Sequence, residues 1–205
     1  MSLYDAVSYP LLAAAEAGDL STVSQLLNAD ANPNERTADG WSALIMAAKS
    51  GHKNVVTRLL MADAAVNPPL HPPTHTALRG ASLSGKLDCV QLLLDNEADT
   101  NQVSAGGRTP LMGAAMNGHA DVVALLLERG AFASSFNTYG ETARAIAEEN
   151  GHTSIVDAIR QREAAPSAGD DGSDGSGTAA LSMGQAADML ASYLDTASQI
   201  SREGV

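Results

Sequence analysis

Residues 109–131 read TPLMGAAMNGHADVVALLLERGA, and this stretch carries the start and end signals of two short helices. Thr109 followed by Pro110 suits a helix N-terminus, because the hydroxyl can accept a backbone N–H and proline is pre-organised for the first helical position. Gly118 suits the end of that helix, since glycine turns left-handed without steric cost. The apolar residues of the VVALLL segment then recur at spacings of three and four. The stretch predicts two helices joined by a tight turn.

The same signals return along the chain at a nearly constant interval. The helix-ending glycine recurs after 33, 34, 33 and 33 residues, at Gly18, Gly51, Gly85, Gly118 and Gly151. A period of this length indicates one small unit stacked several times, in which each unit contacts its neighbours. Such a stack presents a long continuous surface rather than an enclosed pocket, which favours a binding protein.

Each unit repeats the same positions in its first helix. Nine residues before the glycine stand Tyr9, Ser42, Thr76, Thr109 and Thr142, four of which suit a helix N-cap. Four residues before the glycine stand Ala14, Ala47, Ala81, Ala114 and Ala147. A small side chain there lets neighbouring helices approach towards the short end of the roughly 8–10 Å packing range.

The second helix of each unit has one apolar face. Five residues after the glycine stand Val23, Val56, Val90, Val123 and Val156. Eight residues after it stand Leu26, Leu59, Leu93, Leu126 and Ile159, followed by Leu27, Leu60, Leu94 and Leu127 in four units. The last unit has Arg160 in place of that final leucine, which predicts a polar outer face at the end of the stack.

These motifs resemble the ankyrin repeat over roughly residues 9–163. The matching segments are Thr109-Pro110-Leu111, Gly118-His119-Ala120-Asp121-Val122-Val123 and Gly151-His152-Thr153-Ser154-Ile155-Val156. The resemblance implies an all-α solenoid of helix–turn–helix pairs joined by hairpin-like loops. It implies five repeats within residues 3–163, at about 3–36, 37–69, 70–103, 104–136 and 137–163. It also implies that protein partners bind along the hairpin tips and the inner helices.

The chain departs from the family pattern at two places. The histidine that usually follows Thr-Pro-Leu is absent, which removes a local hydrogen bond; the residues there are Ile45, Arg79, Met112 and Ala145. The third repeat has Thr74 where a loop glycine is usual.

Composition limits the classes of function. The formal net charge of −12 argues against a nucleic-acid-binding protein, because phosphates need a basic face. No run approaches 18 consecutive apolar residues, so we expect no membrane span, and Glu16 interrupts the first apolar run, so we expect no signal peptide. Cys89 is the sole cysteine and is interpreted as a small buried apolar group. Without a disulfide framework, an intracellular location in the cytoplasm or nucleus is favoured.

The C-terminal segment differs in composition from the repeats. Residues 164–178 are rich in Gly, Ser, Asp and Ala and predict a flexible acidic linker. Residues 179–205 predict an amphipathic helix, with a capping-box signature at its start and contact residues Met189, Leu190, Tyr193 and Leu194. Three partners for its apolar face stay open: the protein's own solenoid, another chain and a membrane surface, the last disfavoured by the scarcity of Lys and Arg.

The family geometry implies which residues contact a partner. Trp41, His75 and Arg108 precede the capping hydroxyls, Asp39, Pro73 and Tyr139 occupy the loop tips, and Lys49, Leu83 and Met116 end the first helices. We expect Trp41 to stand at an exposed position and to dominate binding with Tyr139 and Arg108, because Trp, Tyr and Arg are enriched in interface hot spots. The alternative is that Trp41 packs on neighbouring loops.

Residues 67–75 form a loop with four prolines, which is either a preformed contact ridge or a tolerated insertion. Its His71 and His75 fall short of a closed zinc shell, and His52, His119 and His152 are interpreted as structural. We expect no metal site, no cofactor and no catalytic arrangement, since neither a nucleophile–His–Asp spacing nor a paired carboxylate is found.

Asn34, Asn67 and Asn101 occupy the turn asparagine of the family, where the side-chain amide braces the loop. The resemblance also makes Asn101 a candidate substrate for an oxygen-dependent asparagine hydroxylase, although bracing is the favoured role.

The sequence predicts a non-catalytic protein–protein interaction module, such as an adaptor, scaffold, inhibitor or assembly factor, that is monomeric when isolated. The alternative is a permanent structural subunit of a multiprotein complex, anchored partly by its C-terminal helix.

Overall fold

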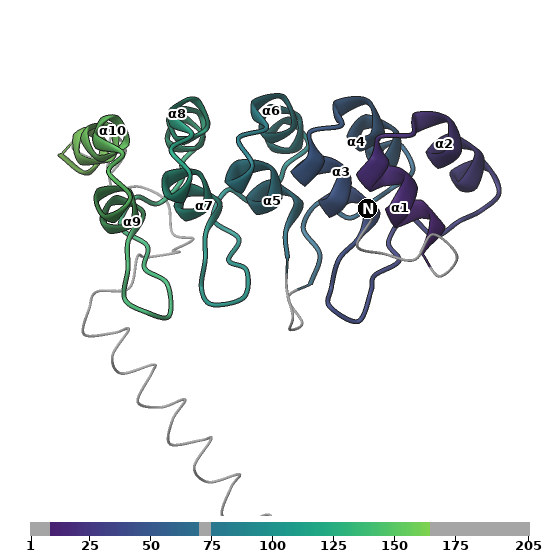
Figure 1. Ribbon diagram of the computed structural model, residues 1–205, viewed down its shortest axis with the longest axis horizontal. Coiled ribbons are helices and arrows are strands. Elements are labelled where there is room, and N and C mark those ends of the chain that lie inside the picture. The colour runs from purple at the N-terminus through teal and green to yellow at the C-terminus, as the bar shows by residue number, and fades with distance from the viewer. Residues whose placement is uncertain (1–8, 70–74, 165–205) are drawn as a thin grey trace, which may run out of the picture. The chain divides into compact units, whose positions relative to one another are not determined.

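The computed structural model describes residues 9–69 and 75–164, which belong to one compact unit. Ten helices follow one another in these residues (Figure 1), with the bounds α1 Pro10–Ala17, α2 Leu20–Asn28, α3 Ala43–Ser50, α4 Lys53–Leu60, α5 Ala77–Leu83, α6 Leu87–Asp95, α7 Pro110–Met116, α8 Ala120–Glu128, α9 Ala143–Glu149 and α10 Thr153–Ala164. The expected all-α solenoid is confirmed. The C-terminal segments expected at 164–178 and 179–205 lie outside the described residues, except for Ala164 at the end of α10.

The ten helices form five consecutive pairs, α1–α2 to α9–α10, arranged in two rows (Figure 1). The inner row consists of α1, α3, α5, α7 and α9, each of which packs against the next, and the outer row consists of the even-numbered helices. Hairpin-like loops project from the inner row, and isolated antiparallel bridges close three of them, at Arg36–Ser42, Ser104–Arg108 and Phe136–Thr142. The period in the sequence therefore corresponds to one helix pair and one loop.

The predicted capping hydroxyls act as N-caps. The side-chain oxygens of Ser42, Thr76, Thr109 and Thr142 each accept the backbone N–H three residues later, at 3.2–3.4 Å. Tyr9 stands at the N-cap of α1 but makes no side-chain capping bond. Four of the five inner helices therefore begin where the hydroxyl stands, as expected.

Small residues bring the inner helices together. The five repeated alanines are all buried. Gly80 in α5 and Gly113 in α7 add to this, because a Cβ on Gly113 would lie 3.4 Å from the backbone N of Leu83. In the outer row the repeated valines and Leu59, Leu93, Leu126 and Ile159 are buried, and each fully buried side chain of this size stabilises the fold by about 1.5–3 kcal/mol.

The end of the solenoid is polar, as the sequence predicts. Arg160 of α10 is 60% exposed, and its guanidinium lies 3.6 Å from Glu148 and 3.9 Å from Asp157. These charges face water where a further repeat would otherwise stack.

Histidines tie successive pairs together at the turn edge, the edge formed by the turns at Gly18, Gly51, Gly85, Gly118 and Gly151. The Nε2 atoms of His52, His119 and His152 lie 3.0–3.2 Å from the carbonyl oxygens of Glu16, Leu83 and Met116 in the preceding pairs. Each ring packs against the glycine of that pair. The third pair has Lys86 at this position; its side chain packs against Gly51 but makes no hydrogen bond there. The structural role expected for the three histidines is confirmed.

Asparagines tie the loops between pairs. Asn34 donates to the carbonyl of Asp63 and accepts from the backbone N of Ala65, at 3.0 and 2.7 Å. Asn67 bonds in the same way to Glu97 and Asp99, and Asn101 bonds to Gly130 and Phe132. The bracing role predicted for these asparagines is confirmed, and hydroxylation of Asn101 stays a prediction.

Candidate protein-binding surface

The inner surface consists of the solvent-facing side chains of the inner row and of the loops that precede it. Two positions recur on it in register: the residue before each cap, which is Trp41, His75, Arg108 or Glu141, and a residue in the last turn of the helix, which is Lys49, Leu83, Met116 or Glu149. The residue three positions after the cap varies in exposure: Ile45 and Met112 are buried, Arg79 is half-buried and Ala145 is exposed. The surface is therefore a grid whose chemistry changes from pair to pair.

Trp41 is packed against its neighbours. Its indole stacks on the imidazole of His75 from the next loop, with ring centroids 3.9 Å apart and planes 13° apart. The ammonium of Lys49 lies 5.1 Å from the centre of the indole, within cation–π range. The expectation that Trp41 is exposed is wrong, because the side chain is half-buried against the core. The competing interpretation, packing on neighbouring loops, describes it better.

The position of Trp41 is fixed from the backbone outward. Its N–H donates to the hydroxyl of Thr37 at 3.1 Å, and its carbonyl accepts the N–H of Thr37 at 2.9 Å. Arg36 donates to the carbonyl of Gly40 at 3.0 Å. The loop therefore holds the indole in place before any ligand arrives, which lowers the entropic cost of binding.

A hollow of about 210 Å³ opens beside this stack, between the second and third helix pairs. Its lining combines apolar and cationic groups, namely Trp41, Ile45, Lys49, His75, Thr76, Arg79, Gly80 and Leu83. Four of the residues predicted to contact a partner, Trp41, Lys49, His75 and Leu83, are thus brought together around one hollow. Gly80 leaves room here, since a Cβ at this position would point towards Lys49 and Ile45.

The floor of the hollow is electropositive. Burial lowers the pKa of the Arg79 guanidinium, and the nearby charge of Arg108 lowers it further. Burial also lowers the pKa of His75, with further lowering by Arg79, Lys49 and Arg36 and an opposing effect of Asp39. His75 is therefore neutral at pH 7, while Arg79, Lys49 and Arg36 around it carry positive charge and Asp39 carries negative charge.

The remaining predicted contacts lie apart from the hollow. Met116 is half-buried on α7, and Tyr139 is 74% exposed on the last loop. Asp39 is exposed at the tip of the second loop. Pro73, His71 and the tail residues Met189, Leu190, Tyr193 and Leu194 lie outside the described residues.

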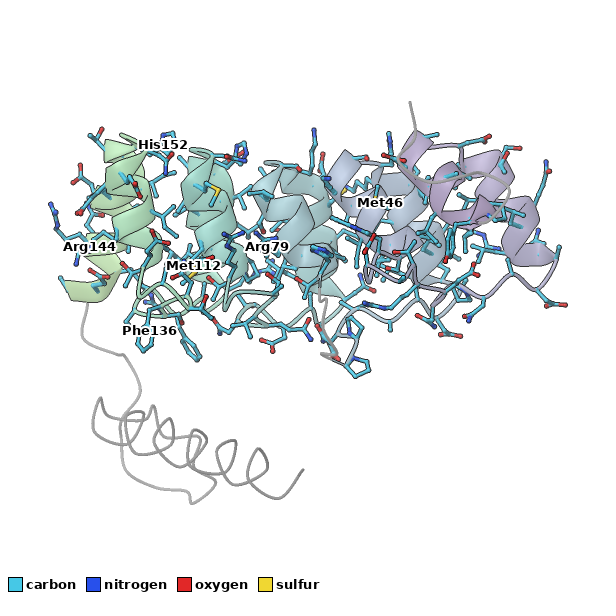
Figure 2. All side chains as sticks on the ribbon, turned by 60° about the horizontal axis from the view of Figure 1, so that its bottom comes forward. Met46, Arg79, Met112, Phe136, Arg144 and His152 are labelled. Atoms are coloured by element: carbon cyan, nitrogen blue, oxygen red, sulfur yellow. The ribbon has the colours of Figure 1, made fainter. Side chains whose placement is uncertain are left out.

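Sequence reasoning missed two features of this surface. The family pattern marks Arg79 only as a departure, although a cation at a position that is apolar in the neighbouring repeats, at Ile45 and Met112, is a signal for a contact residue. Phe132 and Phe136 are 64% and 58% exposed, on the same loop as Tyr139. Figure 2 shows Phe136 at the hairpin edge, the edge formed by the tips of the hairpin-like loops, opposite His152 at the turn edge.

Cys89 is buried, and burial raises the pKa of its thiol, with Asp88 adding to the effect. This agrees with its interpretation as a small apolar group. Within residues 9–69 and 75–164, no three His, Cys, Asp or Glu side chains gather as potential metal ligands, and no helix is long and apolar enough to cross a membrane.

The stacked helix pairs, their hairpin loops and the open inner surface define the class of helical repeat proteins. A model of ankyrin repeats matches residues 11–104 and 78–170, which together make up well over half of the chain. The chain therefore belongs to the ankyrin-repeat family, whose repeats are generally protein–protein interaction modules and typically non-catalytic. No curated protein matches the sequence.

Proposed function

We propose that this chain is a non-catalytic protein-binding module that holds its partner on the inner surface, as an adaptor, scaffold, inhibitor or assembly factor. The observation that carries the proposal is the preorganised Trp41, held by its loop and by His75 beside an open hollow. Rigid aromatic side chains beside a pocket are typical of interface hot spots. Arg108 and Tyr139 extend the contact towards the last loop.

The partner surface is tested by crosslinking from defined positions in cells. A photoreactive residue at Met116 on the inner row is compared with one at Thr57 on α4, which is exposed on the outer row. We expect a protein adduct from Met116 that is lost in the Trp41→Ala background, and none from Thr57. Adducts of equal yield from both positions, or adducts that persist without Trp41, would contradict the proposed surface.

We further propose that the chain works inside the cell, is a monomer when isolated and does not bind nucleic acid. The formal net charge of −12 supports solubility and disfavours phosphate backbones, and a single cysteine suits a reducing compartment. Analytical ultracentrifugation of the purified chain tests whether it is monomeric. The distribution of the chain between cell fractions tests whether it is intracellular.

A further inference from the structure

We propose that the partner of this surface presents a short acidic segment, with a carboxylate bound by Arg79 and Arg108 and a neighbouring apolar side chain inserted in the hollow beside Trp41. This inference rests on the proposed function and specifies the chemistry of its ligand.

Positive charge is concentrated on three consecutive inner helices or their loops. The chain has 12 Lys and Arg against 24 Asp and Glu, yet Lys49, Arg79 and Arg108 occupy the second, third and fourth pairs of one surface. None of the three has an ion pair within the described residues. Several cations elsewhere are paired, as in Lys53–Asp88 at 3.1 Å and Arg129–Asp95 at 3.0 Å. These three cations are therefore unmatched, whereas Arg144 on the inner helix α9 pairs with Glu148 and Glu163.

Arg79 has the strongest need of an anion. Its Nε is buried and has no hydrogen-bond partner, and the side chain is half-buried beside a second guanidinium. A buried donor without an acceptor is costly, and like charges repel. A carboxylate removes both costs, because a guanidinium presents paired donors that match the two carboxylate oxygens.

The hollow selects for an apolar neighbour of that carboxylate. Ile45, Leu83 and the indole of Trp41 provide apolar walls, and Gly80 leaves the space between them. Small-molecule sites usually measure about 300–1,000 Å³, and a hollow of about 210 Å³ is smaller than that range. Its size suits one aliphatic side chain of a peptide.

Carboxylates at both ends of the row of cations restrict the length of the acidic segment that can bind. Asp39 stands at the tip of the second loop, and Glu141 of the fifth pair is held by hydrogen bonds to Asn137. A long polyanion such as a nucleic acid would run from the cations into these groups. A segment of a few residues does not.

The acidic stretch of this chain itself lacks the required apolar group. Asp170 and Asp171 are adjacent, Asp174 follows after Gly172 and Ser173, and the side chains around them are no larger than aspartate. This stretch can supply charge but cannot fill the hollow. Elsewhere in the chain, Asp188 stands beside Met189 and Asp195 beside Leu194, and both pairs match the chemistry of the ligand, so the test below includes these two aspartates. We assign the site to a partner protein.

The test is selection of random 12-residue peptides displayed on phage against the full-length chain. We expect enrichment of peptides with one or two acidic residues next to Leu, Ile, Val or Met. The Arg79→Glu variant should reverse the preference and enrich basic peptides. The most enriched acidic peptide is then titrated calorimetrically against variants that keep the wild-type circular dichroism spectrum and melting temperature.

Arg79→Gln should weaken the binding of that peptide at least tenfold, and Arg108→Gln should weaken it by a smaller factor. Lys53→Gln, which removes a cation from the outer row of the second pair, is the matched control and should change the affinity less than twofold. Affinity should fall between 50 and 300 mM salt, because the contact is ionic.

Four outcomes would overturn the inference. Enriched peptides without acidic residues that still need Trp41 would leave the proposed function standing and refute the acidic ligand, whereas peptides that bind independently of Trp41 would refute both. A variant with Asp170→Asn, Asp171→Asn and Asp174→Asn, or one with Asp188→Asn and Asp195→Asn, that binds the peptide tenfold more tightly would assign the site to the chain's own C-terminal residues. A dT12 oligonucleotide that competes at micromolar concentration would assign it to nucleic acid.

Discussion

Trp41 and His75 lie ring on ring, 3.9 Å between centroids, although they belong to different loops and are 34 residues apart. The stack joins the second helix pair to the third at the hairpin edge. The stack also places the titratable imidazole of His75 at the border of the proposed ligand site. Arg79, Lys49, Arg36 and Asp39 are the charged groups around it.

We predict that the stability of the protein falls as the pH is lowered below about 6.5. Burial lowers the pKa of His75 in the folded protein, and the positive charges around it lower this pKa further. The unfolded chain therefore binds more protons than the folded protein in this pH range. Protonation of His75 therefore favours unfolding. The contribution of neutral His75 to stability is complete above the pKa of the unfolded chain and is lost as the pH falls through the pKa of the folded protein. Urea unfolding between pH 5 and 7.5 measures this effect against His75→Phe, which keeps an aromatic ring but cannot titrate. Parallel pH profiles for the two proteins would exclude His75 as the source.

We predict that Gly118→Ala destabilises the protein more than Gly130→Ala does. Both glycines have positive φ, +75° and +84°, so both substitutions carry a similar backbone cost of about 1 kcal/mol. A Cβ at Gly118 would also lie 2.7 Å from the ring of His152, whereas at Gly130 it would meet nothing within 4 Å. Displacing the ring breaks its bond to Met116, which adds about 1 kcal/mol. Urea unfolding gives the two values.

The His152→Ala background is the control for this steric argument. With the ring removed, Gly118→Ala and Gly130→Ala should cost nearly the same. A difference that persists in that background would show that the histidine is not responsible.

We predict that Asn101→Ala lowers the free energy of unfolding by about 1–3 kcal/mol, because two bonds to the next loop are lost together. Asn101→Asp keeps an acceptor for the N–H of Phe132 and loses the donor to Gly130, so its cost should be intermediate. Equal stability of all three proteins in chemical denaturation would argue against bracing by this residue.

We predict that Cys89 resists thiol reagents in the folded protein. Its side chain is buried and the pKa of its thiol is raised by burial, so little reactive thiolate meets the reagent. Labelling with Ellman's reagent at pH 8 should be slow in buffer and fast in 6 M guanidinium chloride. Rapid labelling without denaturant, at the rate of the denatured chain, would contradict this assignment.

The repeated backbone framework could be predicted from the sequence, because each of its parts depends on a local signal. Thr109 caps α7 because of its hydroxyl, Ala114 lets α7 approach its neighbours, and Val123 places the apolar face of α8. Each signal acts within one repeat and recurs in the others. A single departure, such as Tyr9 at the N-cap position of the first repeat, therefore does not obscure the pattern.

The inner surface could be predicted only as a set of positions. Whether Trp41 points to water or stacks on His75 depends on the relative placement of two loops, and one of these is the proline-rich loop of residues 67–75. Arg79 lines one hollow together with Trp41 and Ile45 of the neighbouring pair. Such contacts join residues more than 30 positions apart, and no periodic pattern in one sequence specifies them.

The lysine at position 86 has a consequence for how the array comes apart. The other turn-edge junctions that begin at α1, α5 and α7 each have a histidine bond, and the junction from α3 to α5 does not. In a linear array, stability depends on the coupling between neighbouring repeats. Across this junction the coupling comes from the packing of α3 on α5, the stack of Trp41 on His75 and the ion pair of Lys53 with Asp88. A peptide that contacts both Trp41 and Arg79 would add a further link between the second and third pairs, so its binding should make the array melt over a narrower range of temperature.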